Sequence, residues 1–137
     1  MVVVVAVIGI AAATAAPSLL AAWRVSAFAA GVAELSTVLH RARQLAVAEN
    51  TSVCVQPVVA GVRLRTRGCA GAVWTGPGTD PDGLIRLSGE LEVVGDGAIV
   101  FTHLGGAAPA GTLTLRDRAT GRSRRVVVAA TGQVSAP

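Results

Sequence analysis

The stretch MVVVVAVIGIAAATAAPSLLAA, residues 1–22, decides how the rest of the chain has to be built. It contains no charged residue, and the first charge in the chain is Arg24. At a helical rise of about 1.5 Å per residue, about 22 residues span roughly 33 Å, which matches the hydrocarbon core of a bilayer. We therefore predict that residues 1–22 form a membrane-spanning helix.

Two other structures are compatible with such an apolar N-terminus, namely a cleaved signal peptide and a buried strand. A signal peptide has basic residues before its apolar run, and none is present here, although Ala-Thr-Ala-Ala-Pro-Ser resembles a small-residue cleavage site. A strand of this length would be about three times too long. In a membrane helix, Pro17 is expected to cause a kink, and Gly9 with its Ala neighbours forms a thin face for helix packing.

Beyond residue 22 the apolar residues are confined to one side of the predicted helix. They recur at intervals of three and four residues, the spacing of one helical face. The residues of this face are Val25, Phe28, Val32, Leu35, Leu39, Ala42, Leu45 and Ala46. Asn50 is a suitable C-terminal cap. We predict one helix from Val2 to about Glu49, with residues 1–22 in the membrane and residues 23–50 forming an amphipathic half.

Residues 51–137 have the alternating pattern and the turn residues of a β-rich domain. Val62, Leu64 and Thr66 alternate with three Arg, so one face of that strand is expected to be solvent-exposed. The predicted strands are Ser52–Pro57, Val62–Arg67, Leu84–Leu87, Leu91–Val94, Ala98–Thr102, Gly111–Arg116 and Arg124–Ala129. The last three are expected to form an antiparallel meander. The predicted fold class is α+β, a long N-terminal helix packed on one antiparallel sheet of about five to seven strands.

Cys54 and Cys69 are the only cysteines of the chain. One lies on the first predicted strand and the other just after the second, so a disulfide would close a loop of about 16 residues and contribute about 3 kcal/mol. We expect this bond if the domain lies outside the cytoplasm, and two buried thiols otherwise. The spacing fits neither a CxxC redox motif nor a zinc site, and no metal and no other cofactor is predicted.

The other polar residues form no recognisable catalytic motif. Asp80 and Asp82 lie in a Pro- and Gly-rich segment and are expected to be turn formers. His40 is placed on the predicted helix, and His103 at the end of a predicted strand. We predict no enzymatic activity and no small-molecule substrate. The absence of Tyr and an aromatic content of 3% also argue against base-stacking platforms.

Four stretches of the chain, taken in order, resemble the type IV pilin superfamily, and in particular its GspH/FimT-type minor pseudopilins. They are VVVVAVIGIAAATAAPSL, RARQLAVAENTSVCV, IVFTHLGGAAPAGTLTL and RRVVVAATGQVS. The first resembles the pilin transmembrane segment, with Gly9 and Pro17 in register. The resemblance implies a structural subunit without catalytic activity, anchored by one helix in the inner membrane with its domain outside the cytoplasm. Its implied partners are the membrane and other pilin or pseudopilin subunits, in a type II secretion pseudopilus or a type IV pilus.

The chain departs from the pilin pattern at its start. Pilin precursors carry a short basic leader, a peptidase cleavage site and then a segment that contains Glu. With Gly9 and Pro17 in register, that Glu falls just before Met1. We interpret this as a start codon that was assigned too far downstream, and a truncated copy is the alternative.

Two further functions are compatible with the sequence. Some FimT-type pilins take up DNA through a basic Gly-Arg-x-Arg motif, and Gly-Arg-Ser-Arg-Arg at residues 121–125 fits it, which makes Arg122, Arg124 and Arg125 candidate DNA contacts. This segment precedes the closing strand, however, and the turn that often carries Arg in the family is uncharged here. A solvated hairpin tip is the simpler interpretation. A membrane-anchored binding module outside the cytoplasm is the other alternative.

Overall fold

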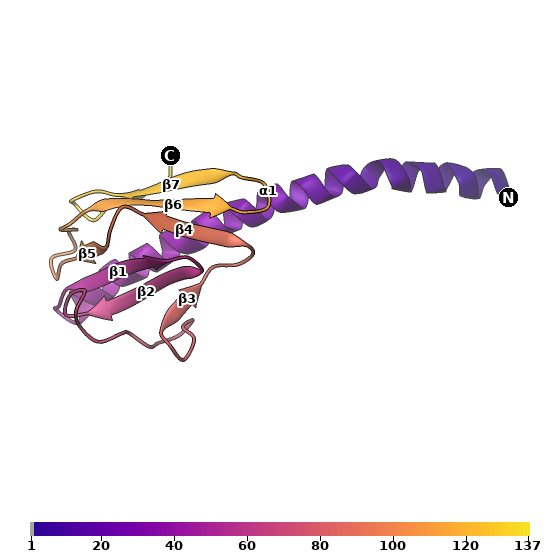
Figure 1. The fold of residues 1–137 in the computed structure, drawn as a ribbon. Coiled ribbons are helices and arrows are strands. Elements are labelled where there is room, and N and C mark those ends of the chain that lie inside the picture. Colours follow the sequence, from indigo (N-terminus) through magenta and orange to yellow (C-terminus); the bar gives the residue numbers. More distant parts are fainter. Residues whose placement is uncertain (1) are drawn as a thin grey trace.

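The computed structural model describes residues 2–137, apart from the side chains of residues 14 and 15. These residues form a single long helix, α1 (Val2–Ala48), followed by a domain of eight strands. The N-terminal half of α1 projects far beyond the domain, whereas its C-terminal half lies along the domain (Figure 1). The predicted α+β fold with a long N-terminal helix is confirmed.

The continuous helix predicted from Val2 to about Glu49 is confirmed, with Pro17 inside it. Asn50 ends the helix in a left-handed conformation, with φ of 49°. The amide of the next residue, Thr51, donates a hydrogen bond of 3.0 Å to the carbonyl of Ala46. Asn tolerates this conformation better than most residues, so a local residue preference stops the helix and turns the chain toward the first strand.

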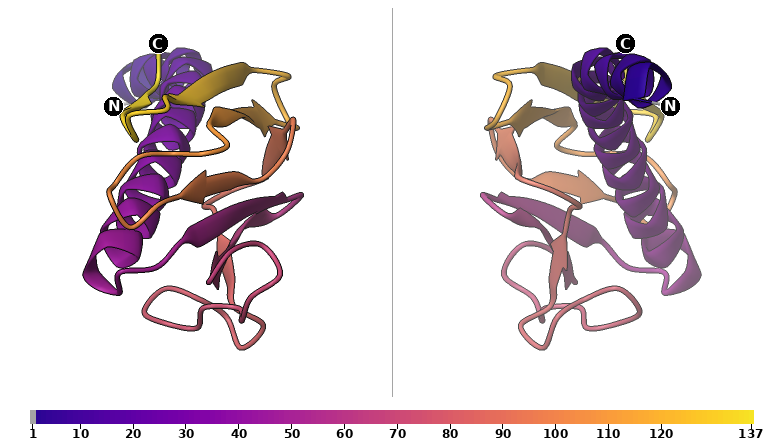
Figure 2. Two further views of the ribbon diagram at one scale, coloured as in Figure 1. Left: turned by 90° about the vertical axis from the view of Figure 1, so that its left-hand side faces the viewer. Right: turned by 90° about the vertical axis from the view of Figure 1, so that its right-hand side faces the viewer.

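The strands form two four-stranded antiparallel sheets. The first sheet has the order β3-β2-β1-β5 and the second has the order β4-β6-β7-β8. The strands are β1 (Val53–Val58), β2 (Gly61–Thr66), β3 (Leu84–Arg86), β4 (Leu91–Gly95), β5 (Ile99–Phe101), β6 (Gly111–Asp117), β7 (Ser123–Val128) and β8 (Val134–Ser135). When the molecule is turned by 90° from the view of Figure 1, α1 is seen to run past both sheets on one side (Figure 2).

The prediction of one sheet, with β5, β6 and β7 as a meander, is wrong. β6 and β7 do form a hairpin, but β5 pairs with β1, so that Phe101 lies opposite Val53. The neighbour of β6 on its other side is β4, with Val93 opposite Leu115. Alternation along a strand identifies its buried face but not its partner. The Gly-rich connection between β5 and β6 leaves β5 free to join the other sheet.

The core lies between α1 and the two sheets. From α1 it receives the buried residues Val32, Leu35, Val38, Leu39, Ala42 and Ala46. Phe101 is the largest fully buried side chain and has 0% exposure. Most of the predicted apolar face is therefore confirmed, but Val25 is 46% exposed, because it precedes the part of α1 that the sheets cover. Among the residues with described side chains, no polar residue is buried.

Candidate functional site

The N-terminal half of α1 projects away from the β-domain (Figure 1). Its large apolar side chains are exposed, for example Val2 at 85%, Ile10 at 67% and Trp23 at 76%. Apart from the neighbouring helix backbone, no described atom lies within 4 Å of the position where a Cβ on Gly9 would stand. By length and composition, α1 is long and apolar enough to cross a membrane. Exposed apolar surface on this scale requires a lipid or protein environment.

Two small hollows lie between α1 and the tip of the β6–β7 hairpin, where the projecting half of the helix meets the domain. A hollow of about 240 Å³ is lined by Ala21, Arg24, Val25, Thr120 and Arg122. The other, of about 230 Å³, has Trp23 and Phe28 from the helix and Asp117 and Ala119 from the hairpin among its lining residues. The hairpin tip thus lies beside the point where the apolar segment ends.

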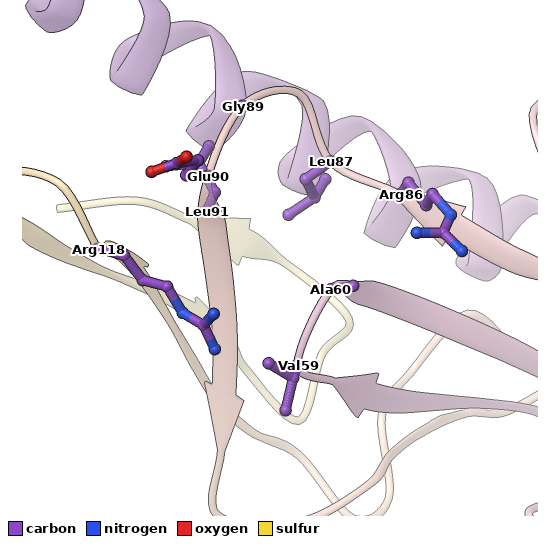
Figure 3. Close-up of a pocket in the computed structure, with 8 residues that line it drawn as sticks. All are labelled: Val59, Ala60, Arg86, Leu87, Gly89, Glu90, Leu91 and Arg118. Atoms are coloured by element: carbon purple, nitrogen blue, oxygen red, sulfur yellow. The ribbon is translucent and has the colours of Figure 1, made fainter.

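A third hollow, of about 440 Å³, opens between the β1–β2 turn and the start of β4 (Figure 3). Its lining residues are Val59, Ala60, Arg86, Leu87, Gly89, Glu90, Leu91 and Arg118. Both Arg are paired with carboxylates, Arg86 with Asp80 and Arg118 with Glu92, each at 3.4 Å. No cluster of three or more His, Cys, Asp or Glu side chains occurs within the described part of the chain. The hollow therefore presents neither a nucleophile–base pair nor a set of metal ligands.

The structure confirms that Cys54 and Cys69 form a disulfide, with 5.0 Å between their Cα atoms. Cys54 is buried on β1, and Cys69 follows β2. Arg65 fastens the same loop, since its guanidinium donates hydrogen bonds to Gln56 Oε1 at 2.9 Å and to the Gly71 carbonyl at 2.8 Å. The loop is thus attached covalently and by hydrogen bonds, and the disulfide contributes about 3 kcal/mol by chain entropy.

Asp80 is a turn former, as predicted. Its Oδ1 accepts hydrogen bonds from the backbone amides of Leu84 at 2.9 Å and Asp82 at 3.0 Å. The hydrogen bond from Leu84 is the main cause that holds the pKa of Asp80 below its ordinary value of 3.8. Burial opposes this effect, and the hydrogen bond from Asp82 and the nearby Arg86 lower the pKa further. The carboxylate therefore organises the loop that leads into β3.

Replacing Asp80 with Asn should weaken the acid sensitivity of the fold. Because the pKa of Asp80 is lowered on folding, its ionised form contributes stability above the ordinary value of 3.8. That contribution is lost as the pH falls through the lowered folded-state value. The variant should therefore lose less stability than the wild type between about pH 7 and about pH 2, measured by denaturant unfolding in detergent. Asp82→Asn, which keeps both hydrogen bonds, is the control, and equal pH dependence in all three chains would contradict the prediction.

The structure places the predicted DNA contacts Arg122, Arg124 and Arg125 together in the β6–β7 hairpin, all exposed. Arg124 donates a hydrogen bond of 3.3 Å to the carbonyl of Pro137. In Figure 1 this hairpin is at the end of the domain from which the N-terminal half of α1 projects. The motif by itself carries no sign that it lies beside the end of the apolar segment.

The opposite end of the domain has a contact that the sequence analysis missed. Arg43 on α1 donates a hydrogen bond of 2.8 Å to the carbonyl of Gly105. Gly132, with φ of 80°, packs directly on the backbone of Gly105, so that a Cβ at this position would overlap it. The only signal in the sequence was the Thr-Gly turn near the C-terminus. The uncharged turn at residues 131–133 therefore has a structural role.

Comparisons with known proteins agree on the kind of fold. The family described as type II transport protein GspH matches residues 31–132. No curated protein sequence matches the chain. Two crystal structures of the type IV minor pilin FimU from Pseudomonas aeruginosa strain PAO1 are similar to it, each 18% identical over 78% of this chain. The match to the first structure covers 90% of the FimU chain with a TM-score of 0.57, and the match to the second covers 85% with a TM-score of 0.58.

Proposed function

Because the chain belongs to the GspH family of type II transport proteins, we propose that it is a minor pseudopilin, a structural subunit of a type II secretion pseudopilus or a type IV pilus. The observation that carries this proposal is the two-part helix. The described side chains of residues 2–23 are exposed and are apolar or small, and the second half of the helix forms one wall of the domain core. Such a helix suits a subunit that is held in a bilayer before assembly and packed among other helices afterwards.

The proposed location is the cytoplasmic membrane, with a single crossing by α1 and the β-domain outside the cytoplasm. The length and apolar composition of α1 support the crossing. The disulfide between Cys54 and Cys69 supports the location of the domain, since structural disulfides persist in oxidising compartments. The proposed partners are other pilin or pseudopilin subunits, which would contact α1, where Gly9 offers room for close packing.

A deletion of the coding sequence in the source organism tests this function. We expect loss of type II protein secretion or of surface pili, and recovery when the wild-type gene is returned. A photoreactive residue at Ile8, which is 64% exposed, should then form adducts with other pilin-type subunits in the complemented cells. The same residue at Ala70, which is exposed and directly follows Cys69 in the β-domain, is the control. Normal secretion and piliation without the gene, together with no subunit adducts from Ile8, would contradict the proposal.

A further inference from the structure

We propose that the β6–β7 hairpin binds the phosphate headgroups of anionic phospholipids at the surface of the membrane that α1 crosses. This inference rests on the proposed membrane anchoring of α1 and adds a second contact with the bilayer, made by the folded domain. Three observations carry it: the charge of the hairpin, the freedom of its Arg side chains, and its position beside the end of the apolar segment.

The net positive charge of the chain lies in the hairpin. Residues 116–125, Arg-Asp-Arg-Ala-Thr-Gly-Arg-Ser-Arg-Arg, contain five Arg and one Asp, a net charge of +4. The complete chain also has a formal net charge of +4, so the other residues balance to zero. All five Arg of the hairpin are exposed. The positive charge is therefore concentrated in one short segment instead of being spread over the surface.

Three of these five guanidinium groups have no partner in the described part of the protein. No side-chain hydrogen bond or ion pair engages Arg116, Arg122 or Arg125, whereas Arg118 is paired with Glu92 at 3.4 Å. The one acidic residue of the hairpin, Asp117, is occupied by its own turn, since it accepts hydrogen bonds from Thr120 Oγ1 at 2.8 Å and from the amide of residue 119. A guanidinium binds phosphate oxygens in a bidentate manner, so free Arg side chains suit this ligand.

The position of the hairpin selects a lipid as the source of the phosphate. Residues 2–22 of α1 span about 31 Å, which fills the hydrocarbon core and places Trp23 at the interface, where Trp is enriched. Arg122 and Thr120 share a hollow with Ala21, and Asp117 shares one with Trp23. A bilayer around the first half of α1 therefore brings the hairpin tip to the headgroup layer.

Duplex DNA is the competing ligand for the same Arg side chains. With α1 in a membrane, the hairpin tip is directed toward the bilayer, and a rod as wide as a duplex would have to fit between the domain and the lipid surface. Glu90, which lines the same hollow as Trp23 and Asp117, adds a negative charge on the same side. A headgroup layer can rearrange around these groups, whereas a duplex presents its phosphates at a fixed spacing. The geometry therefore favours the lipid.

The test uses the full chain in nanodiscs made of equal parts phosphatidylglycerol and phosphatidylcholine. A photoreactive residue replaces Ala119, which is exposed at the hairpin tip. Mass spectrometry then counts the adducts of each lipid. We expect phosphatidylglycerol adducts to exceed phosphatidylcholine adducts about tenfold at low salt, since each Arg near an anionic surface is attracted to it. The excess should shrink in about 0.5 M NaCl because salt screens the attraction.

Matched variants separate the hairpin from the overall charge. Arg122→Gln with Arg125→Gln should bring the two lipids to nearly equal yields. Arg41→Gln with Arg67→Gln removes the same charge away from the hairpin. The guanidinium of Arg41 donates a hydrogen bond of 2.8 Å to the carbonyl of Pro77, and the amide of Arg67 donates one of 2.8 Å to the carbonyl of Ser52. This variant should keep the excess. Inserted chains that show no lipid preference would overturn the inference and leave the anchoring intact. Duplex DNA binding that needs Arg122 and Arg125, without a lipid preference, would also overturn it. A chain that does not insert would overturn the anchoring, and the inference with it.

Discussion

A chain that carries Ile8→Arg together with Ala12→Arg should be recovered in the soluble fraction after alkaline extraction, whereas the wild type should stay with the membranes. Both side chains are exposed, lie one helical turn apart and are near the middle of the apolar segment. Each Arg at the centre of a membrane helix costs about 2.5–3.5 kcal/mol on the insertion scale, so the pair costs about 5–7 kcal/mol. That is more than a thousandfold in the insertion equilibrium, at about 1.4 kcal/mol for each factor of ten.

The control for this experiment places the same two charges farther along the same helix. Ala29→Arg with Ala33→Arg has the same spacing and also changes exposed positions, but it lies beyond Trp23, outside the predicted crossing. These chains should remain in the membrane fraction. If the Ile8 and Ala12 variant also stayed there, α1 would be held by something other than insertion of its first half.

Replacing Phe101 with Ala should lower the free energy of unfolding by about 3–5 kcal/mol, the usual cost of removing a buried aromatic side chain. Phe101 has 0% exposure and lies opposite Val53 at the end of β5, within the core cluster that α1 shares with both sheets. Its removal leaves a cavity where the three layers meet. Denaturant unfolding of the full chain in detergent, followed by circular dichroism of the sheets, measures the loss.

Leu104→Ala is the matched control for Phe101→Ala. Leu104 is three residues away and 83% exposed, so its truncation should change the free energy of unfolding by no more than about 0.5 kcal/mol. A loss below about 1 kcal/mol for Phe101→Ala would show that β5 does not close the core as described. Such a result would also argue against the pairing of β5 with β1 instead of β6, because the buried position of Phe101 depends on that pairing.

Local sequence patterns predict some features of the candidate site and miss others. The disulfide and the turn role of Asp80 were predictable, because each involves residues close in sequence with a known preference. The hydrogen bond from Arg43 to Gly105 was not, because it joins residues 62 positions apart. The basic motif of the hairpin was recognisable in the sequence as a candidate DNA contact. The structure places Arg122 beside Ala21, which makes it a candidate lipid contact instead.

The sequence by itself determined the two-part helix, its end near Asn50, the α+β class and the buried side of β2 at Val62 and Leu64. These features depend on interactions between neighbours along the chain and on the period of the apolar residues. Only the tertiary structure decided that the strands divide into two sheets, that β5 pairs with β1, and that the β6–β7 hairpin lies where α1 leaves the domain. The physical reason is that strand partners and surface neighbours are selected by packing across long chain separations. Several pairings bury the same apolar faces along the chain, and only the packed core distinguishes between them.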